Sequence, residues 1–125
     1  MYEITVEDKF PAAHFLKLYD GSWEERHDHV FKVSVVMRSE KLDSIGVVAD
    51  FEALKPAIKK TLKEFSDICV NDHPEFGQGR VSNSSVENMA RVIFQKLSQN
   101  FKSDNASLVK VTVWETPDAS ASYCA

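Results

Sequence analysis

Residues 27–37 of this chain read HDHVFKVSVVM, and they decide most of what the sequence predicts about the fold. One face of the segment carries a large apolar side chain at every second position: Phe31, Val33, Val35 and Met37. Alternation with a period of two is typical of a strand that covers a core with one face. We therefore expect a β-strand here, with His29 on its apolar face.

This strand begins with two histidines. Residues i and i+2 of a strand point to the same side, so His27 and His29 can offer their imidazoles to one ion. His14, at the end of residues 10–14 (FPAAH), can complete the set from a neighbouring strand. Three neutral imidazoles and one open position are the usual surroundings of a catalytic zinc. A His-x-His pair is also common without metal, so the alternative is three ordinary histidines.

The same alternation predicts three further strands. The first covers residues 2–6 and continues, bent at Pro11, toward His14. Another covers residues 109–113, and a short fourth strand follows at residues 119–123, after a turn at Pro117 and Asp118. Polar loops are expected at residues 39–46 and 71–79.

A first helix is predicted after Asp50, whose carboxylate can cap it. Its apolar positions have helical spacings of three and four: Phe51, Leu54, Ile58, Leu62 and Phe65. Pro56 lacks an amide proton and clashes with the preceding turn. Either the first turn is therefore separate, or the helix starts near Lys55.

A second helix is predicted from Ser84, because residues 84–87 (SSVE) have the spacing of a capping box. Its apolar stripe consists of Val86, Ala90, Ile93 and Leu97, with Met89 beside it. The order of elements is then ββααββ within one domain, residues 1–125. This order predicts an α+β fold, with two helices on one face of a four-stranded antiparallel sheet. A small sheet with free edges also invites a neighbouring chain.

The composition excludes several classes of protein. Hydrophobic residues make up 43% of the chain and charged residues 27%, as in soluble globular proteins. The net charge of −4 argues against a general nucleic-acid-binding protein. We find neither a signal peptide nor an apolar run long enough for a membrane span. Cys69 and Cys124 form no CxxC motif, which fits a reducing cytoplasm.

Six segments together resemble the 6-pyruvoyl-tetrahydropterin synthase family, which includes the 6-carboxytetrahydropterin synthases of the queuosine pathway. They have the family's order and spacing: FPAAH (10–14), HDH (27–29), GVVADFEALK (46–55), VNDHP (70–74), SSVEN (84–88) and WET (114–116). The resemblance implies a tunnelling fold (T-fold), whose subunits form a β-barrel ring, either a hexamer or another trimer-based homo-oligomer. It also implies zinc on His14, His27 and His29, with active sites at subunit interfaces.

The resemblance further implies that Glu115 holds the ring of a pterin substrate. A carboxylate accepts two parallel hydrogen bonds from the pterin's 2-amino group and adjacent ring nitrogen, a planar pairing that is selective. Residues 84–87, with the proposed substrate-binding residues Ser85 and Glu87 among them, lie near the pterin in this family, where a helix N-terminus also offers amide protons. The alternatives are a solvated glutamate at the end of the third strand and a capping box at residues 84–87.

The chain departs from the family at the positions that move protons. Trp23 replaces the cysteine that lies four residues before the first histidine of His-x-His, and Ser66 and Asp67 replace an Asp-His dyad. The glycine usual between the paired histidines is Asp28. The resemblance alone therefore does not carry the standard synthase activity. We expect Trp23 to be a buried core residue, although it can also block the pocket or stack on a ligand.

Three residues are candidates for the missing acid or base. A subgroup of the family has glutamate instead of cysteine, in a pattern Glu-x-x-His-x-His that Glu24 fits. That subgroup cleaves dihydroneopterin triphosphate to 6-hydroxymethyl-dihydropterin, a folate precursor. A carboxylate can take a hydroxyl proton if burial raises its pKa toward neutrality. Asp67 and His73 are the other candidates, and the alternative for Glu24 and Glu25 is a pair of exposed loop charges.

We therefore expect a zinc-dependent lyase acting on 7,8-dihydroneopterin triphosphate or a related pterin, by carbon–oxygen elimination or carbon–carbon cleavage, in queuosine or folate biosynthesis. The main alternative is a family member that binds zinc and a pterin-like ligand without the standard synthase activity. A structural domain with incidental histidines is a third interpretation, to which the combined motifs give the least support.

Overall fold

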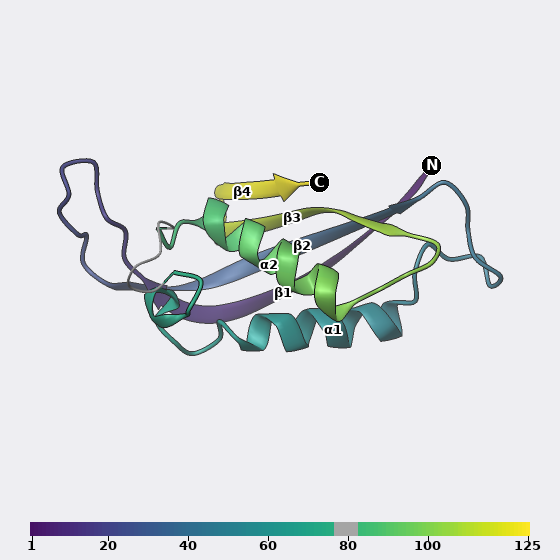
Figure 1. The fold of residues 1–125 in the computed structure, drawn as a ribbon, viewed down its shortest axis with the longest axis horizontal. Helices are drawn as coiled ribbons and strands as arrows, with labels where there is room; N and C mark the ends of the chain where they lie inside the picture. The colour runs from purple at the N-terminus through teal and green to yellow at the C-terminus, as the bar shows by residue number, and fades with distance from the viewer. Residues whose placement is uncertain (77–82) are drawn as a thin grey trace.

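A single antiparallel sheet organises the chain. The computed structural model describes residues 1–76 and 83–125, so residues 77–79 of the predicted loop lie outside the described residues. The sheet has the order β1-β2-β3-β4 (Figure 1). Its strands are β1 (Tyr2–His14), β2 (His27–Ser39), β3 (Ser107–Thr116) and β4 (Ala119–Cys124). The four predicted strands and the α+β class are confirmed.

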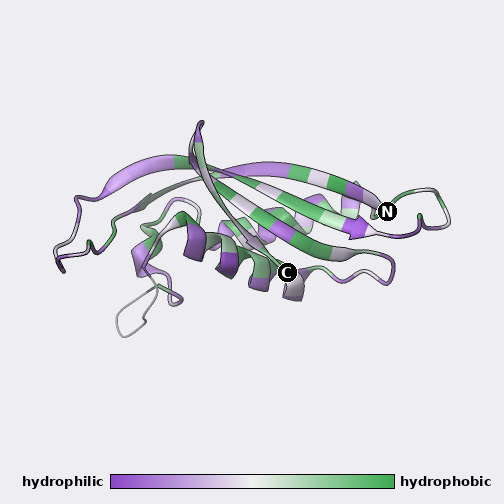
Figure 2. Cartoon of the chain, turned by 90° about the horizontal axis from the view of Figure 1, so that it is seen from above, coloured by the Kyte–Doolittle hydropathy of each residue, from purple (hydrophilic) through white to green (hydrophobic). Residues whose placement is uncertain are grey.

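One face of this sheet forms the core. Hydrophobic and polar residues alternate along the strands (Figure 2). Phe10 of β1 pairs with Phe31 of β2, and both are buried. Directly paired residues of antiparallel strands point to the same face. The same face therefore continues, four residues further along each strand, to the pair His14–His27.

Helix α1 (Phe51–Lys63) packs on the core face through Leu54, Ile58 and Leu62, all buried. The Asp50 carboxylate caps it as predicted, accepting a hydrogen bond from the Glu52 N–H at 2.9 Å. Both helices lie on the same face of the sheet (Figure 2).

Two predictions for α1 are wrong. The helix runs without interruption through Pro56, so it has neither a separate first turn nor a start near Lys55. The proline removes one backbone hydrogen bond, and the buried residues on both sides of it hold the helix against the sheet. Phe51 is 45% exposed and does not belong to the buried stripe, because it is the first residue of the helix.

Helix α2 (Val86–Asn100) begins one residue later than the predicted cap implies. Ser85 is the cap, and its hydroxyl accepts a hydrogen bond from the Asn88 N–H at 3.2 Å. Ser84 does not cap the helix, because its hydroxyl lies instead against Phe15 and Asn71. In residues 1–76 and 83–125, no helix has the length and apolarity needed to cross a membrane.

Two segments flank the end of β1. Residues 67–69 run beside it, where the Ala13 N–H donates to Ile68 O at 3.0 Å, and the short helix η1 (Val70–Asp72) follows. Residues 15–26 continue from the end of β1 and project beyond the sheet before β2 begins (Figure 1). Trp23 lies on this loop and is 57% exposed, so the prediction that it belongs to the core is wrong. Trp23 instead packs edge-on against the Phe15 ring, and the Lys17 ammonium lies 5.9 Å from the centre of its ring.

Candidate metal centre

Three histidines meet where β1 ends and β2 begins. His14 is the last residue of β1 and pairs with His27, the first residue of β2. His29 follows two residues later on the same face. The ring centroids lie 4.5 Å apart for His14 and His27, 4.8 Å for His27 and His29, and 5.5 Å for His14 and His29. The structure thus brings together all three histidines that the sequence singled out.

Glu115, near the end of β3, adds a carboxylate to this cluster. Its Oε1 lies 2.7 Å from His14 Nε2, 3.5 Å from His29 Nε2 and 3.7 Å from His27 Nε2. Taking one ligand atom from each of the four residues, all lie within 4.8 Å of one another. Ligand atoms of a tetrahedral zinc, with bonds of about 2.0–2.1 Å, are about 3.4 Å apart. Small side-chain movements would therefore suffice to hold one ion.

Backbone carbonyls fix the protons of two of these rings. His14 Nδ1 lies 2.7 Å from Ser84 O, and His27 Nδ1 lies 3.0 Å from Glu25 O. A carbonyl oxygen only accepts, so each Nδ1 must donate. The Nε2 atom of each ring is then left with its lone pair toward the centre when the ring is neutral. Histidines that bind metal usually donate their other nitrogen in this way, which fixes the ring.

The contact between His14 and Glu115 needs a hydrogen or a cation between its two atoms. With Nδ1 donating to Ser84, a neutral His14 has only a lone pair at Nε2, and an ionised Glu115 has only lone pairs at Oε1. These two atoms are 2.7 Å apart. Two facing lone pairs repel at this distance, so a shared proton or a metal cation would satisfy the contact.

His29 is kept in the state that binds metal. Removal from water lowers the pKa of its imidazole below the ordinary value, although the Glu115 carboxylate opposes the shift. The neighbouring His27 and His14 lower the pKa further, and Asp28 raises it. The net lowering favours the neutral ring near pH 7, and only a neutral imidazole can ligate.

These donors fit zinc. Imidazole nitrogen is a common ligand of zinc and other transition metals, whereas calcium and magnesium prefer sets made of oxygen. Three imidazoles leave the fourth tetrahedral position for Glu115, water or a substrate oxygen.

Glu24 lies at the edge of the cluster. Its Oε1 accepts a hydrogen bond from the Leu16 N–H at 2.9 Å and lies 3.9 Å from His27 Nε2. The Glu24 side chain is 29% exposed, which leaves it open to a ligand. Its neighbour Glu25 has an exposed side chain and contributes its backbone carbonyl to His27.

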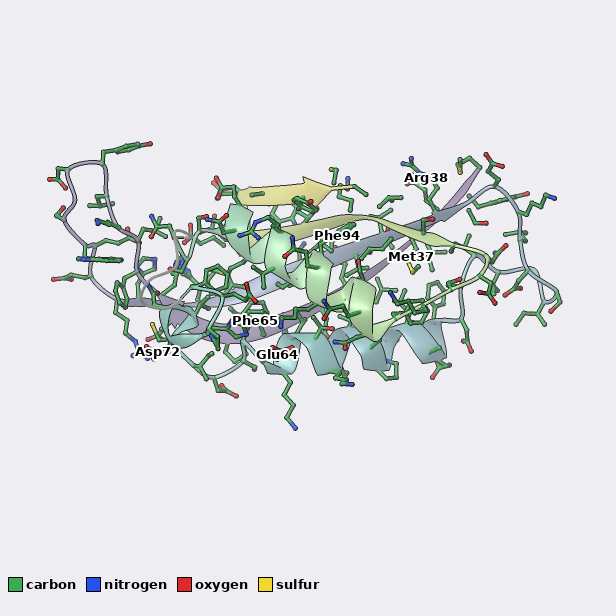
Figure 3. The ribbon with its side chains drawn as sticks, in the orientation of Figure 1. Met37, Arg38, Glu64, Phe65, Asp72 and Phe94 are labelled. Carbon is green, nitrogen blue, oxygen red and sulfur yellow. The ribbon has the colours of Figure 1, made fainter. Side chains whose placement is uncertain are left out.

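The other two acid–base candidates are not members of the histidine–glutamate cluster. Asp67 is exposed, adopts a φ of 61°, and donates its N–H to Pro11 O at 2.7 Å. His73 is buried and stacks on Phe65, with ring centroids 4.6 Å apart. Its Nε2 lies 3.2 Å from Glu64 Oε1, at the end of α1 (Figure 3).

The predicted substrate-binding residues Ser85 and Glu87 lie at the start of α2. Ser85 caps the helix, and Glu87 is an exposed residue of the first turn. They directly follow Ser84, whose carbonyl holds His14. The beginning of α2 therefore lies next to the histidine cluster, because Ser84 precedes the helix cap and binds His14.

The sequence did not identify Ser84, Asn71 or Asn83 as parts of this centre. Ser84 acts on His14 through a backbone carbonyl, which has no sequence signal because every residue has one. Asn71 and Asn83 bind the backbone of Phe15 and Lys17 from far along the chain. Asn71 and Ser84 do occur in two of the family-like segments, residues 70–74 and 84–88, and this is the one signal that the sequence offers for them.

Comparisons with known proteins find similarity over nearly the whole chain. The family model "6-pyruvoyl tetrahydropterin synthase" matches residues 3–125. A dihydroneopterin monophosphate aldolase of Pyrococcus furiosus is 32% identical over 112 residues, which are 90% of this chain and 88% of that protein. A 6-carboxy-5,6,7,8-tetrahydropterin synthase of Haemophilus influenzae is 25% identical over 142 residues, covering 98% of this chain and 99% of that protein.

A solved structure is also similar to this chain over its whole length. The Caenorhabditis elegans 6-pyruvoyl tetrahydropterin synthase matches with a TM-score of 0.81 and 27% identity, over 100% of this chain and 97% of that chain. The similarity therefore extends over the whole fold, including the strand ends that carry the histidines.

Proposed function

Because the chain belongs to the 6-pyruvoyl tetrahydropterin synthase family, we propose that it is a zinc-dependent lyase that shortens the side chain of a dihydropterin. The substrate proposed is 7,8-dihydroneopterin triphosphate or a related pterin. The observation that carries the proposal is the convergence of three imidazoles, two of them oriented by backbone carbonyls, beside a carboxylate. Zinc bound there would polarise a hydroxyl or carbonyl oxygen of the pterin side chain as a Lewis acid.

Glu115 is proposed to hold the pterin ring. A carboxylate has two oxygens in one plane and accepts paired N–H donors, as the ring edge of a pterin offers. The Glu115 carboxylate lies within 4 Å of the Nε2 atoms of all three histidines, so it would set the distance between the pterin ring and the metal. Positioning of this kind lowers the barrier by fixing the reacting side chain in place.

Glu24 is proposed as the general base. It lies near His27, is partly exposed, and is fixed by the Leu16 N–H, which a mobile surface carboxylate would not be. It would take the proton from the hydroxyl on the carbon of the leaving fragment that forms the breaking bond. That carbon becomes a carbonyl as the carbon–carbon bond breaks. The electron pair passes into the adjacent C=N bond of the dihydropterin ring, and the carbon that stays on the pterin then takes up a proton.

Two observations favour this carbon–carbon cleavage over carbon–oxygen elimination. Trp23 occupies the position of the family's cysteine and is turned outward, whereas Glu24 lies beside His27. The similarity to the Pyrococcus furiosus aldolase, at 32% identity, supports the same reaction class.

The second candidate function is binding of zinc and a pterin-like ligand without turnover. It is favoured by the residues at the family's three proton-transfer positions, Trp23, Ser66 and Asp67. Both candidates share the metal centre and differ in whether Glu24 replaces the lost groups.

We also propose that the chain works in the cytoplasm as a homo-oligomeric ring, with active sites at subunit interfaces. Strands β1 and β4 form the two edges of the sheet, and an edge strand can pair with another copy of the chain. The mass in solution, compared with 14.1 kDa for one chain, gives the number of subunits.

The deciding experiment incubates the zinc-loaded protein with 7,8-dihydroneopterin triphosphate and, separately, with 7,8-dihydroneopterin, and identifies the products. We expect a 6-hydroxymethyl pterin, and a loss of about 100-fold or more in kcat for Glu24→Gln. Glu25→Gln is the matched control, because it keeps the backbone carbonyl that His27 uses. Pterin binding without product would support the non-catalytic candidate, and equal activity of Glu24→Gln and wild type would remove Glu24 from the mechanism.

A further inference from the structure

Side chains accept from the backbone N–H groups of all three residues after His14, in addition to a backbone hydrogen bond from the Glu24 N–H to Leu16 O. Asn71 brackets Phe15, since Asn71 Oδ1 accepts from the Phe15 N–H at 3.0 Å and Asn71 Nδ2 donates to Phe15 O at 2.8 Å. Asn83 brackets Lys17 in the same manner, with both distances 2.9 Å. Each amide satisfies one N–H and one carbonyl, as a paired strand would.

Asn71 also reaches the residue that holds His14. The Ser84 hydroxyl lies 2.9 Å from Asn71 Oδ1 and 3.1 Å from Phe15 O, so it can donate to either oxygen. Ser84 O in turn accepts the Nδ1 proton of His14 at 2.7 Å. Ser84 and His14 are each 1% exposed, so water cannot replace these contacts.

We propose that Ser84 and Asn71 are positioning residues for the metal ligand His14, acting through the chain of contacts Asn71–Ser84–His14. The Ser84 hydroxyl fixes the peptide whose carbonyl receives the His14 Nδ1 proton. That bond in turn directs the Nε2 lone pair toward His27, His29 and Glu115. The inference rests on the proposed function only for the identity of the metal, zinc. The hydrogen bonds among Asn71, Ser84 and His14 lie within the protein and do not depend on that function.

The neighbouring Asn83 provides the matched control. It binds Lys17 with the same two bonds as Asn71 binds Phe15, but these bonds are exposed. Within the part of the chain that the structure describes, the Asn83 side chain makes no hydrogen bond to Ser84 or His14. Loss of Asn83 should therefore loosen the loop without releasing the His14 ring.

The test measures zinc affinity by competition with a chromophoric chelator for wild type, Ser84→Ala, Asn71→Ala and Asn83→Ala. Removing an outer partner of a metal-binding histidine typically weakens binding by about 10–100-fold. We expect a loss in that range for Ser84→Ala and Asn71→Ala, and a change within about twofold for Asn83→Ala, as for a surface substitution. The double variant Ser84→Ala/Asn71→Ala should lose less than the product of the single losses, because both act through one path.

A second measurement needs no metal. In the metal-free protein, the His14 Nδ1 proton should give a slowly exchanging downfield imidazole signal in a ¹H–¹⁵N spectrum, which weakens in Ser84→Ala and Asn71→Ala and persists in Asn83→Ala. Urea unfolding of each variant shows that it is folded under these conditions.

The two measurements separate the inference from the proposed function. A wild type that binds no zinc but shows the protected imidazole proton would contradict the function and leave the positioning intact. Ser84→Ala with wild-type zinc affinity and an unchanged imidazole signal would overturn the positioning, as would equal losses in Asn71→Ala and Asn83→Ala.

Discussion

Two buried histidines in this protein each face a glutamate, and they use their rings in opposite ways. His14 Nδ1 donates to a backbone carbonyl, which leaves Nε2 to face Glu115 and two more imidazoles. His73 Nδ1 instead accepts from the Glu75 N–H, so its Nε2 must donate to Glu64 at 3.2 Å when the ring is neutral. The His73 ring thus satisfies its neighbours with both nitrogens, whereas the His14 ring keeps a lone pair for a cation.

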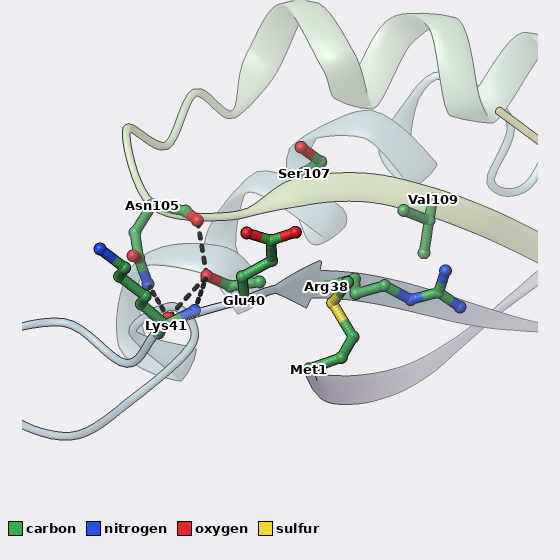
Figure 4. Close-up of a pocket in the computed structure, with 8 residues that line it drawn as sticks. Met1, Arg38, Glu40, Lys41, Asn105, Ser107 and Val109 are labelled. Carbon is green, nitrogen blue, oxygen red and sulfur yellow. Dashed lines mark hydrogen bonds between the residues drawn. The ribbon is translucent and has the colours of Figure 1, made fainter.

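Burial and a carboxylate partner therefore do not by themselves leave a histidine with a lone pair for a cation. The direction of the outer hydrogen bond decides this, because it determines whether the other ring nitrogen carries a lone pair or a proton. The presence of a pocket is no better guide, because open pockets of similar volume lie at both ends of β2, and the one of about 460 Å³ is lined by His29. An open pocket of about 400 Å³ lies at the far end of β2 from the histidines, lined by surface side chains such as Arg38, Lys41 and Asn105 (Figure 4).

The largest effect should come from removing a histidine of the metal cluster, with a substitution of His73 as the comparison. His27→Ala removes one of three ligands, so we expect loss of stoichiometric zinc and of pterin turnover together. His73→Asn should keep the zinc and lower the free energy of unfolding by about 1–3 kcal/mol, because a buried hydrogen-bonding ring is lost. Metal analysis and urea unfolding of both variants measure the contrast. Zinc loss in His73→Asn with zinc retained in His27→Ala would reverse the assignment.

A substitution of Glu115 tests whether the carboxylate beside His14 binds the pterin or the metal. We expect Glu115→Gln to keep zinc bound by the three histidines and to weaken pterin binding by about 10–100-fold. The variant loses one accepting oxygen and its charge, and hydrogen bonds to charged groups contribute about 1.5–3 kcal/mol. Calorimetric titration with a pterin, beside a zinc measurement, separates the two effects. If the zinc is lost instead, Glu115 is a metal ligand and not the ring anchor.

The smallest expected effect is a dependence of the stability of the metal-free protein on pH. The pKa of His29 is lowered in the folded state, so between the two pKa values the unfolded chain binds more protons. Its contribution to the stability of the metal-free protein is therefore full above about pH 6.5 and is lost as the pH falls toward the lowered folded pKa. Unfolding measured from about pH 5 to 7.5 should show stability rising with pH, with a shallower slope in His29→Gln. An identical slope in the variant would exclude His29 as the source.

The sequence predicted the three-histidine convergence because it depends on local rules. A spacing of two places His27 and His29 on one face, and pairing of adjacent strands brings His14 alongside. The strands and both helices followed from the same periodicities. The family resemblance added Glu115, whose place beside the histidines no local pattern reveals.

The remaining features depend on contacts that periodicity does not encode. Trp23 is apolar, but whether it is covered depends on the path of residues 15–26 beyond the sheet. Ser84 fits a capping box as well as Ser85 does, and only its contact with Phe15 and Asn71 decides between them. Pro56 is tolerated because packing on the sheet outweighs one lost hydrogen bond, which no local propensity reports.

Three imidazoles are proposed to hold one zinc ion, and X-ray absorption of the purified protein loaded with one equivalent of zinc measures the ligands of that ion. We expect one tightly bound zinc per chain, with three imidazole nitrogens at about 2.0–2.1 Å and one further light ligand. A zinc that stays exchangeable in bulk solution, or one with no imidazole scattering, would contradict the metal centre and the pterin chemistry proposed for it.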